Sequence, residues 1–462
     1  MSLLNTFIPP HAIREVLSRH KKLFFVGIGG IGMQGLAMLF SRYGFAVGGS
    51  DRTASAAVLQ LREAGIPVSI GHREENVRGY EVVIYTLAAD RETPELVAAR
   101  RAALPCFSRA DLLGFLMSQF PVRIGIAGMH GKSTTTAMLS DIFCTAMRDP
   151  TVVCGGKMGQ GNVVARKGRG RTFLCEACEY KDSFLCLYPT IAVVLNCEWE
   201  HPDYFKSLAQ VKASFHTYMQ RAALVILPAD GAPCNLPPTN GMRVLRFGLS
   251  PVADARAVTV VYRAGCAEFD YWFCGIRRGR VCLSLPGEHN LQNALAALAV
   301  AEACRIPFPL AAQALFACRG VERRLRLRGQ WQGVTVYEDY AHHPTEIRAS
   351  LAALRRMTGG RLLCVFQPHT YSRTAALFDD FAACFAEADE VILLDIYAAR
   401  EENESGVSSK QLAAAAPRAI YMPDFGAAAA HLATHCRAGD LRVVMGAGDA
   451  FQLLDRLPCK TE

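Results

Sequence analysis

The sequence lacks a long hydrophobic run. Within its 462 residues, the longest segment without Asp, Glu, Lys or Arg, residues 23–41, reaches the ~18 residues of a membrane-spanning helix only by including five glycines, a glutamine and a serine, so it is not a continuous apolar run. The amino terminus also lacks the basic and then apolar pattern of a secretion signal, because Phe7 and Ile8 are followed at once by Pro9 and Pro10. These absences predict a cytoplasmic protein without membrane insertion.

The basic stretches of the sequence lack aromatic residues. The formal net charge is +8, and the densest basic stretches lie at 166–171 and 323–328. Neither stretch contains a ring on which a nucleobase could stack. Because a moderate positive charge also suits an anionic small molecule, we expect a small-molecule substrate and no nucleic-acid partner.

The 17 cysteines lack the spacing of a metal or redox centre. Cys175 and Cys178 form one C-x-x-C without a second pair, and Cys186, Cys364 and Cys384 lie inside apolar runs. We interpret these thiols as small hydrophobic core residues, which free cysteines in a cytoplasmic protein commonly are.

A phosphate-binding loop is the most informative segment, although it lacks one glycine of the usual pattern. Residues 125–136 read GIAGMHGKSTTT, with Ile126 where that pattern has its first glycine. From Gly128 onward the parts are present, since Lys132 can reach the β and γ phosphates and the Ser133 hydroxyl can hold Mg²⁺. A strand-like stretch precedes the loop and apolar residues at helical spacing follow it, which places the loop at a helix amino terminus. The alternative is a glycine turn with a solvated lysine.

A second glycine-rich turn lies near the amino terminus. Gly27, Gly29 and Gly32 form G-x-G-x-x-G between the apolar segment 23–26 and a stretch of helical periodicity. Asp51 follows Gly32 at a separation of nineteen residues, where dinucleotide folds bind a ribose. The turn alone is compatible with a nicotinamide oxidoreductase, but it accepts any pyrophosphate. Together with the phosphate loop, it favours a nucleotide-diphosphate substrate at one site and ATP at the other.

Acidic residues and a histidine follow two strand-like segments of the middle region. We interpret 172–180, TFLCEACEY, as one extended strand in which Glu176 and Glu179 point to opposite faces, so that only one readily faces the phosphates. The next strand, 191–195, is followed by two glutamates and His201, at the strand end where α/β folds bind ligands. His201 taken alone is better explained as a hydrogen-bonded turn residue.

Three further polar segments lie toward the carboxyl terminus. GEHNLQNA at 287–294 begins a helix, and its polar groups could cap that helix or contact a base. The clusters at 338–346 and 367–374 each follow a strand-like segment. Either could be an ordinary helix-capping loop, but both at one sheet edge suggest a ligand cleft shared with the middle region.

The order of strands and helices predicts an α/β protein of several domains. Strand-like and helical segments alternate along the chain, which favours parallel sheets, and the length suggests about three domains. We place a nucleotide-binding domain at 1–120, an ATP-binding domain at 121–324 and a third α/β domain at 325–462.

Together, the motifs resemble those of the Mur ligases of bacterial cell-wall synthesis. The resemblance spans essentially the whole chain and rests on GIGGIGMQGLA, GMHGKSTTT, EACEY, NCEWEHPDYF, GEHNLQNALAA, GVERR, EDYAHHPTE, FQPHTYSRT and GAGD, in this order. It implies a Rossmann-like domain for a UDP-sugar, a central P-loop ATPase domain and a carboxyl-terminal Rossmann-like domain. The implied activity is ATP- and Mg²⁺-dependent ligation of L-alanine to the carboxylate of UDP-N-acetylmuramate through an acyl phosphate.

The resemblance also assigns residues, motif by motif. The implied ATP-binding residues are Gly128, Met129, His130, Gly131, Lys132, Ser133, Thr134, His289, Asn290, Asn293, Arg324 and Asp339. The implied substrate-binding residues are Gly29, Gly30, Gly32, Asp51, His72, Thr86, Arg109, His342, His369 and Arg373. The implied metal ligands are Ser133, Glu176 and His201, and the implied catalytic residues are Lys132, Glu176, His201 and His343. Thr370 stands where the family often has arginine.

Other functions leave part of the sequence unused. A nicotinamide oxidoreductase would not need the phosphate loop, and a nucleic-acid-dependent ATPase would not need the second glycine turn. Within the family, the alternative is a recycling ligase that attaches a preformed peptide to the same sugar nucleotide. We expect a monomer or a homodimer.

Overall fold

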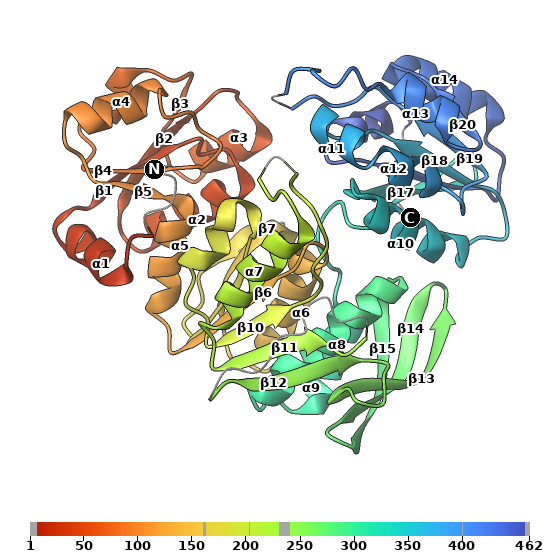
Figure 1. The fold of residues 1–462 in the computed structure, drawn as a ribbon, viewed down its shortest axis with the longest axis horizontal. Helices are drawn as coiled ribbons and strands as arrows, with labels where there is room; N and C mark the ends of the chain where they lie inside the picture. Colours follow the sequence, from red (N-terminus) through yellow and green to blue (C-terminus); the bar gives the residue numbers. More distant parts are fainter. Residues whose placement is uncertain (1–6, 160–162, 203, 231–240, 400, 458–462) are drawn as a thin grey trace.

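Three sheets, one in each third of the chain, form the architecture of this computed structural model (Figure 1). The structure describes residues 7–159, 163–202, 204–230, 241–399 and 401–457. No helix within these ranges is long and apolar enough to cross a membrane. The expected three-domain α/β fold is confirmed. The domain limits drawn from the sequence stay a proposal, and their outer ends at 1 and 462 lie outside the described residues.

The first sheet is parallel, with strand order β3-β2-β1-β4-β5. Its strands are β1 (Lys22–Val26), β2 (Ala46–Asp51), β3 (Val68–Ile70), β4 (Val82–Tyr85) and β5 (Cys106–Ser108). The helices are α1 (Pro10–Arg19), α2 (Ile31–Arg42), α3 (Ala56–Glu63), α4 (Pro94–Arg101) and α5 (Arg109–Ser118), with the 3-10 helix η1 (Glu74–Val77). Helix α5 begins at Ser108, whose side chain forms a reciprocal capping pair with Asp111.

The middle sheet is mixed, with strand order β15-β14-β13-β12-β11-β10-β6-β9-β7-β8. Its strands are β6 (Val122–Ala127), β7 (Thr151–Met158), β8 (Val163–Arg166), β9 (Thr172–Glu176), β10 (Ile191–Val194), β11 (Leu224–Pro228), β12 (Arg243–Gly248), β13 (Ala255–Arg263), β14 (Cys266–Phe273) and β15 (Ile276–Pro286). The helices are α6 (Lys132–Thr145), α7 (Leu208–Met219), α8 (Glu288–Ala303) and α9 (Phe308–Ala317), with η2 (Tyr180–Cys186). The parallel centre of this sheet carries the phosphate loop, because β6 leads directly into α6.

The third sheet has strand order β16-β17-β21-β18-β19-β20, and only β16 is antiparallel to its neighbour. Its strands are β16 (Arg326–Trp331), β17 (Val334–Asp339), β18 (Leu362–Phe366), β19 (Glu390–Leu393), β20 (Ala419–Tyr421) and β21 (Leu441–Met445). The helices are α10 (Pro344–Arg355), α11 (Tyr371–Ala376), α12 (Phe378–Ala383), α13 (Ser409–Ala415) and α14 (Phe425–His435), with η3 (Ala450–Arg456). The parallel pairing of β17 to β21 confirms the parallel sheet expected from the alternation of strand-like and helical segments.

The hydrophobic core joins the first two domains. One buried cluster runs from Leu23 and Phe25 of the first sheet to Phe173 and Val225 of the middle one. Helix α2 packs closely on the middle domain, since a Cβ on Gly35 would lie 3.2 Å from the Cβ of Ala165. The third domain has its own core. The two buried clusters on the faces of its sheet begin at Leu325 and at Val336, and neither contains a residue of the first two domains.

Candidate active site

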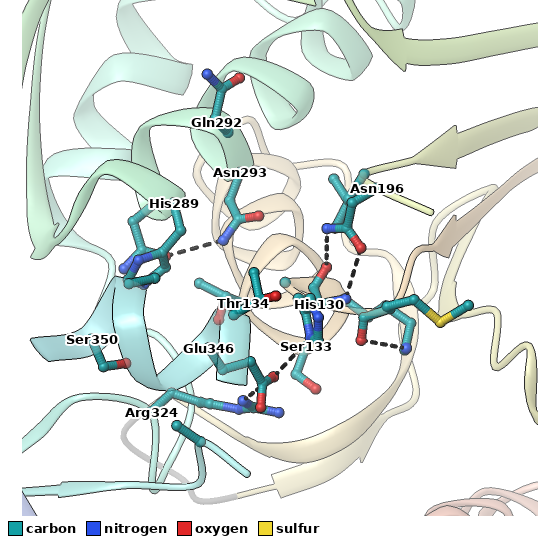
Figure 2. A pocket seen from close by; sticks show the side chains of 18 of the residues that line it. His130, Ser133, Thr134, Asn196, His289, Gln292, Asn293, Arg324, Glu346 and Ser350 are labelled. Atoms are coloured by element: carbon teal, nitrogen blue, oxygen red, sulfur yellow. Dashed lines mark hydrogen bonds and ion pairs between the residues drawn. The ribbon is translucent and has the colours of Figure 1, made fainter. Parts of the chain in front are cut away.

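A cavity of about 650 Å³ opens between the middle domain and the third domain. Its walls come from the phosphate loop, the segments after β9 and β10, the start of α8 and the region around α10, and Figure 2 shows these side chains converging. Among the residues assigned from sequence, those lining the cavity are Met129, His130, Gly131, Lys132, Ser133, Thr134, Glu176, His201, His289, Asn290, Asn293, Arg324, Asp339 and His342. Residues far apart in the chain therefore share one site.

The phosphate loop depends on two glycines. Gly128 and Gly131 have φ values of 140° and 82°, which side chains rarely adopt, and Gly131 is the amino-terminal cap of α6. A Cβ at Gly131 would also collide with the Asn293 amide oxygen. The loop is tied to the strand end behind it, because the His130 N–H donates to Asn196 Oδ1 at 2.9 Å and Asn196 Nδ2 donates to the His130 carbonyl at 3.0 Å (Figure 2).

Lys132 lies in a compact charged group with Glu179. Its ammonium donates to Glu179 Oε2 at 2.9 Å and to the Gly128 carbonyl at 2.5 Å. Burial opposes the charged form, but the Glu179 carboxylate outweighs it and raises the pKa of Lys132 above its usual range. His201 lies on the other side of Glu179, with Nε2 at 3.3 Å from Oε1, and its backbone is left-handed with φ of 56°. The lysine is therefore charged and held at the cavity wall.

The interpretation of 172–180 as one strand is wrong. Strand β9 ends at Glu176, and the chain turns before η2 begins at Tyr180. Glu179 therefore does not alternate with Glu176 along a strand, and both carboxylates line the same cavity. Glu179 is 2% exposed, so it is not a surface group, and the expectation that only one of the two readily faces the phosphates fails with the strand.

Two groups of side chains have donor atoms close enough to hold a cation. Among the described residues these are Glu179 with Glu200 and His201, and His130 with Glu198 and His343, each group having its ligand atoms within 4.8 Å of one another. Glu176 lies elsewhere on the wall, where its Oε1 accepts the Gly155 N–H at 2.5 Å. The geometry thus pairs His201 with Glu179 and Glu200, whereas the sequence paired it with Glu176.

The start of α8 forms a neutral polar wall. Asn290 Nδ2 donates to the Pro286 carbonyl at 2.7 Å, and Asn293 Nδ2 donates to Asn290 Oδ1 at 3.1 Å. Burial lowers the pKa of His289 to about 4, so its imidazole is neutral near pH 7. Asp230 and Phe247, near the ends of β11 and β12, complete this side of the cavity. A pocket with amide groups, a neutral imidazole and an aromatic ring beside one carboxylate suits a purine base.

The third domain contributes charged groups opposite the phosphate loop. Arg324 pairs with Glu346 at 3.1 Å, and Glu346 also pairs with Nδ1 of His130 at 3.2 Å. Asp339 accepts a hydrogen bond from the Ser350 hydroxyl at 2.5 Å, and burial raises the pKa of this carboxyl to about 6. Charges of both signs therefore face the loop across the cavity.

Three third-domain residues assigned from the sequence do not line the cavity, namely His343, His369 and Arg373. Gly128 of the phosphate loop does not line it either. His343 caps α10 and its ring centre lies 4.9 Å from that of His130. Arg373 donates to Glu200 at 3.0 Å and contacts Nδ1 of His369 at 3.3 Å. Burial, with the positive charge of Arg373, lowers the pKa of His369 to about 4.

The predicted residues of the first domain form a separate group outside this cavity. Asp51 is the last residue of β2, and its Oδ2 accepts the Gly29 N–H at 2.8 Å. Arg109 lies against Gly32, where an added Cβ would be 3.2 Å from the arginine side chain, and Thr86 lies against Gly27. His72 pairs with the buried Glu95 at 3.2 Å. The remaining turn residue of this group is Gly30.

Several cavity residues have no role assigned from the sequence. The sequence places Glu198 and Glu200 at a ligand-binding strand end and Glu346 in the polar cluster 338–346, and their position beside histidines is a signal that could have assigned them one. Asp230 and Phe247 had no such signal, because they reach the cavity only through the order of strands in the middle sheet.

Comparison with protein families covers the chain in three successive matches. The description "Mur ligase family, catalytic domain" matches residues 22–121, "Mur ligase middle domain" matches 126–301, and "Mur ligase, glutamate ligase domain" matches 323–448. The three matches follow the order of the three sheets.

Individual proteins match over nearly their full length. A UDP-N-acetylmuramate–L-alanine ligase of Caldanaerobacter subterraneus subsp. tengcongensis is 39% identical over 454 residues, which are 95% of this chain and 97% of that protein. The crystal structure of the UDP-N-acetylmuramate–alanine ligase from Thermotoga maritima superposes with a TM-score of 0.81 at 25% identity, covering 95% of this chain and 98% of that one. A murein peptide ligase of Psychrobacter arcticus has the same fold, with a TM-score of 0.71 at 23% identity over 94% of this chain and 97% of its own. The chain belongs to the Mur ligase family.

Proposed function

We propose that this protein is an ATP-dependent ligase that joins L-alanine to the carboxylate of UDP-N-acetylmuramate in peptidoglycan precursor synthesis. The observation that carries the proposal is the cavity lined jointly by the phosphate loop and by polar residues of the third domain. A nucleotide held by the middle domain would there face substrates held against the third. The relatives at 36–40% identity that bear the name of this activity support the same assignment.

The reaction requires two steps, because a carboxylate is too stable for direct attack by an amine. A carboxylate oxygen of UDP-N-acetylmuramate attacks the γ-phosphorus of ATP, and ADP leaves. The amine of L-alanine then attacks the carbonyl carbon of the acyl phosphate, loses a proton and displaces inorganic phosphate. The net products are an amide, ADP and phosphate.

Lys132 is the residue we assign to the γ-phosphate. Its charge is maintained by Glu179 at 2.9 Å, and its ammonium is confined between that carboxylate and the Gly128 carbonyl. A cation in a fixed position opposite the developing negative charge stabilises phosphoryl transfer without reorganisation. Glu179 acts here by holding the lysine.

The donor set fits Mg²⁺. The Ser133 hydroxyl and the Glu176, Glu179 and Glu200 carboxylates line the cavity with His201, and hard oxygen donors of this kind are what Mg²⁺ prefers. Of these, Ser133 and Glu176 would hold the ion, whereas His201, which the family resemblance adds to this site, lies with Glu179 and Glu200. Bound there, Mg²⁺ would neutralise charge on the phosphates.

The amino-acid side of the site is assigned to the third domain. Arg373, 8% exposed, offers a guanidinium for the carboxylate of L-alanine, although Glu200 occupies one of its N–H groups. His342 and His369 are neutral near pH 7, since burial, with the charge of Arg373, lowers their pKa values to about 3 and about 4. Neutral imidazoles beside the arginine would not repel the incoming ammonium group.

The sugar nucleotide is assigned to the first domain. The glycine turn at Gly29, Gly30 and Gly32 lies at the amino terminus of α2, whose dipole favours a pyrophosphate, and beside the guanidinium of Arg109, although Asp51 already accepts the Gly29 N–H. The lactyl carboxylate would then extend toward the phosphate loop of the middle domain. The predictions of a cytoplasmic location and of a monomer or homodimer accompany this proposal.

The test is phosphate release with ATP, Mg²⁺ and UDP-N-acetylmuramate, with each amino acid added singly. We expect L-alanine to give the highest kcat/KM. Phosphate release only with a preformed peptide would replace this function by that of the recycling ligase. Release that does not require the sugar nucleotide would refute both.

A further inference from the structure

A buried thiol lies between the two residues to which we assign Mg²⁺. Cys154, in β7, is 1% exposed, and its Sγ lies 3.0 Å from Glu176 Oε1 and 3.7 Å from the Ser133 carbonyl oxygen. Cys154, one of 17 cysteines, therefore contacts a carboxylate that we assign to the metal ion.

The thiol is a hydrogen-bond donor in this position. The Cys154 Sγ lies 3.0 Å from Glu176 Oε1, and because a carboxylate oxygen can only accept, the S–H group is the donor. The neighbouring Gly155 N–H donates to the same Glu176 oxygen at 2.5 Å. Two consecutive residues of β7 thus bind Oε1.

The Cys154 S–H and the Gly155 N–H both donate to Glu176 Oε1, and together they fix the orientation of the Glu176 carboxylate. A side chain at residue 155 would disturb this arrangement, since a Cβ on Gly155 would come within 2.7 Å of Glu176 Oε2. With Oε1 occupied by the strand, Oε2 is the oxygen left to meet a ligand in the cavity.

We propose that Cys154 is a positioning residue for the Mg²⁺ site: its S–H orients Glu176 through Oε1 and leaves Oε2 for the cation. The proposal rests on the proposed function, in which Ser133 and Glu176 hold the ion. Groups that orient metal ligands influence affinity strongly, and removing one commonly weakens binding by roughly 10- to 100-fold. Because a thiol is a weak donor and the Gly155 N–H remains, the lower end of that range applies here.

The experiment compares four variants by two readouts. Cys154→Ala removes the donor, and Cys154→Ser retains one. Cys364→Ala is the matched control, because Cys364 is also fully buried but lies in β18 of the third sheet. Glu176→Gln tests the underlying site. Binding of Mn²⁺ in the presence of a non-hydrolysable ATP analogue is titrated by electron paramagnetic resonance, and the Mg²⁺ concentration for half-maximal ADP formation is measured alongside.

We expect Cys154→Ala to raise both midpoints about tenfold, with kcat recovered at saturating Mg²⁺. Cys154→Ser should stay close to wild type, and Cys364→Ala should leave both midpoints unchanged even if it lowers Tm. A shift with Glu176→Gln but none with Cys154→Ala would overturn the role of Cys154 while leaving the proposed site intact. Unchanged midpoints with Glu176→Gln would overturn both.

Discussion

The first and third domains adjoin the middle domain in opposite ways. The first domain shares a continuous hydrophobic cluster with it, which includes the contact of Phe120 and Phe173 at 5.3 Å between ring centres. The third domain meets it through polar groups, among them Glu200 with Arg373 at 3.0 Å and Glu198 with Thr345 at 2.9 Å. An apolar interface stabilises one arrangement, whereas a charged one responds to ligands, pH and salt.

The apolar contact of the first domain and the polar contact of the third domain suit different roles in the proposed reaction. The first-domain residues of the shared hydrophobic cluster do not line the cavity. We therefore expect the first domain to hold a long substrate at a constant distance from the phosphate loop. Polar contacts between the middle and third domains, here called the polar seam, involve the cavity residues Glu198, Glu200 and Thr345. Arg373, which pairs with Glu200, is the residue we assign to L-alanine. Binding at this seam and apposition of the two domains are therefore coupled.

The largest effect expected at the polar seam comes from Lys132→Ala. Loss of the ammonium removes the charge opposite the γ-phosphate, so ligation should fall below detection. Because we assign the sugar nucleotide to the first domain, the affinity for UDP-N-acetylmuramate by calorimetric titration should change little. A folded variant that loses this affinity as well would contradict two separate nucleotide sites.

Phe173→Ala is the most direct test of the hydrophobic cluster shared by the first and middle domains. Phe173 is fully buried in the shared cluster, so the cavity left behind should cost about 3–5 kcal/mol. We expect the first and middle domains to unfold together at a lower temperature in calorimetry. The matched control is Phe366→Ala in β18, equally buried, which should lower only the third-domain transition. Independent unfolding of the first domain would refute a common core.

Glu179→Gln tests the charged group behind the phosphate loop. Without the carboxylate, Lys132 loses its partner at 2.9 Å and its position, so ADP formation should fall roughly 100-fold. Added Mg²⁺ should rescue Glu176→Gln in part but not Glu179→Gln. Stronger rescue at Glu179 would make it a metal ligand, in keeping with its position beside Glu200 and His201.

The polar seam should also open at high pH. His130 faces Glu198, Glu346 and His343; although burial opposes the charge, the two carboxylates raise its pKa from 6.5 to about 10. A raised pKa means that the contribution of this cation to the apposed state is complete below about pH 6.5 and lost as the pH rises through about 10.

The measurement is the radius of gyration by small-angle scattering between pH 6.5 and 10.5. The radius of gyration of the wild type should increase with rising pH more than that of His130→Gln, because glutamine does not titrate. Identical curves would show that this ion pair does not hold the third domain.

The smallest effect is expected for nicotinamide nucleotides. The glycine turn of the first domain accepts pyrophosphates in general, but Asp51, the residue predicted to bind a ribose, already accepts the Gly29 N–H. NADH and NADPH should therefore give no saturable fluorescence change at micromolar concentration. Quenching by NADH that NAD reverses would restore the oxidoreductase alternative.

Sequence by itself determined the local features of this protein. Glycine spacing located the two phosphate turns, because Gly131 must adopt a backbone conformation that other residues avoid. Apolar periodicity located β1, β17, β18 and α8 with errors of few residues, since burial imposes the period of each element. The order of motifs then identified the family.

Only the tertiary structure decided which side chains meet. The end of β9 at Glu176 placed Glu179 beside Lys132, and a turn of this kind leaves no periodic signal. Glu346 reaches His130 from another domain, and Asp230 reaches the cavity through strand order. Such contacts depend on how elements that are distant in the chain pack together, and a local pattern of residues does not specify that packing.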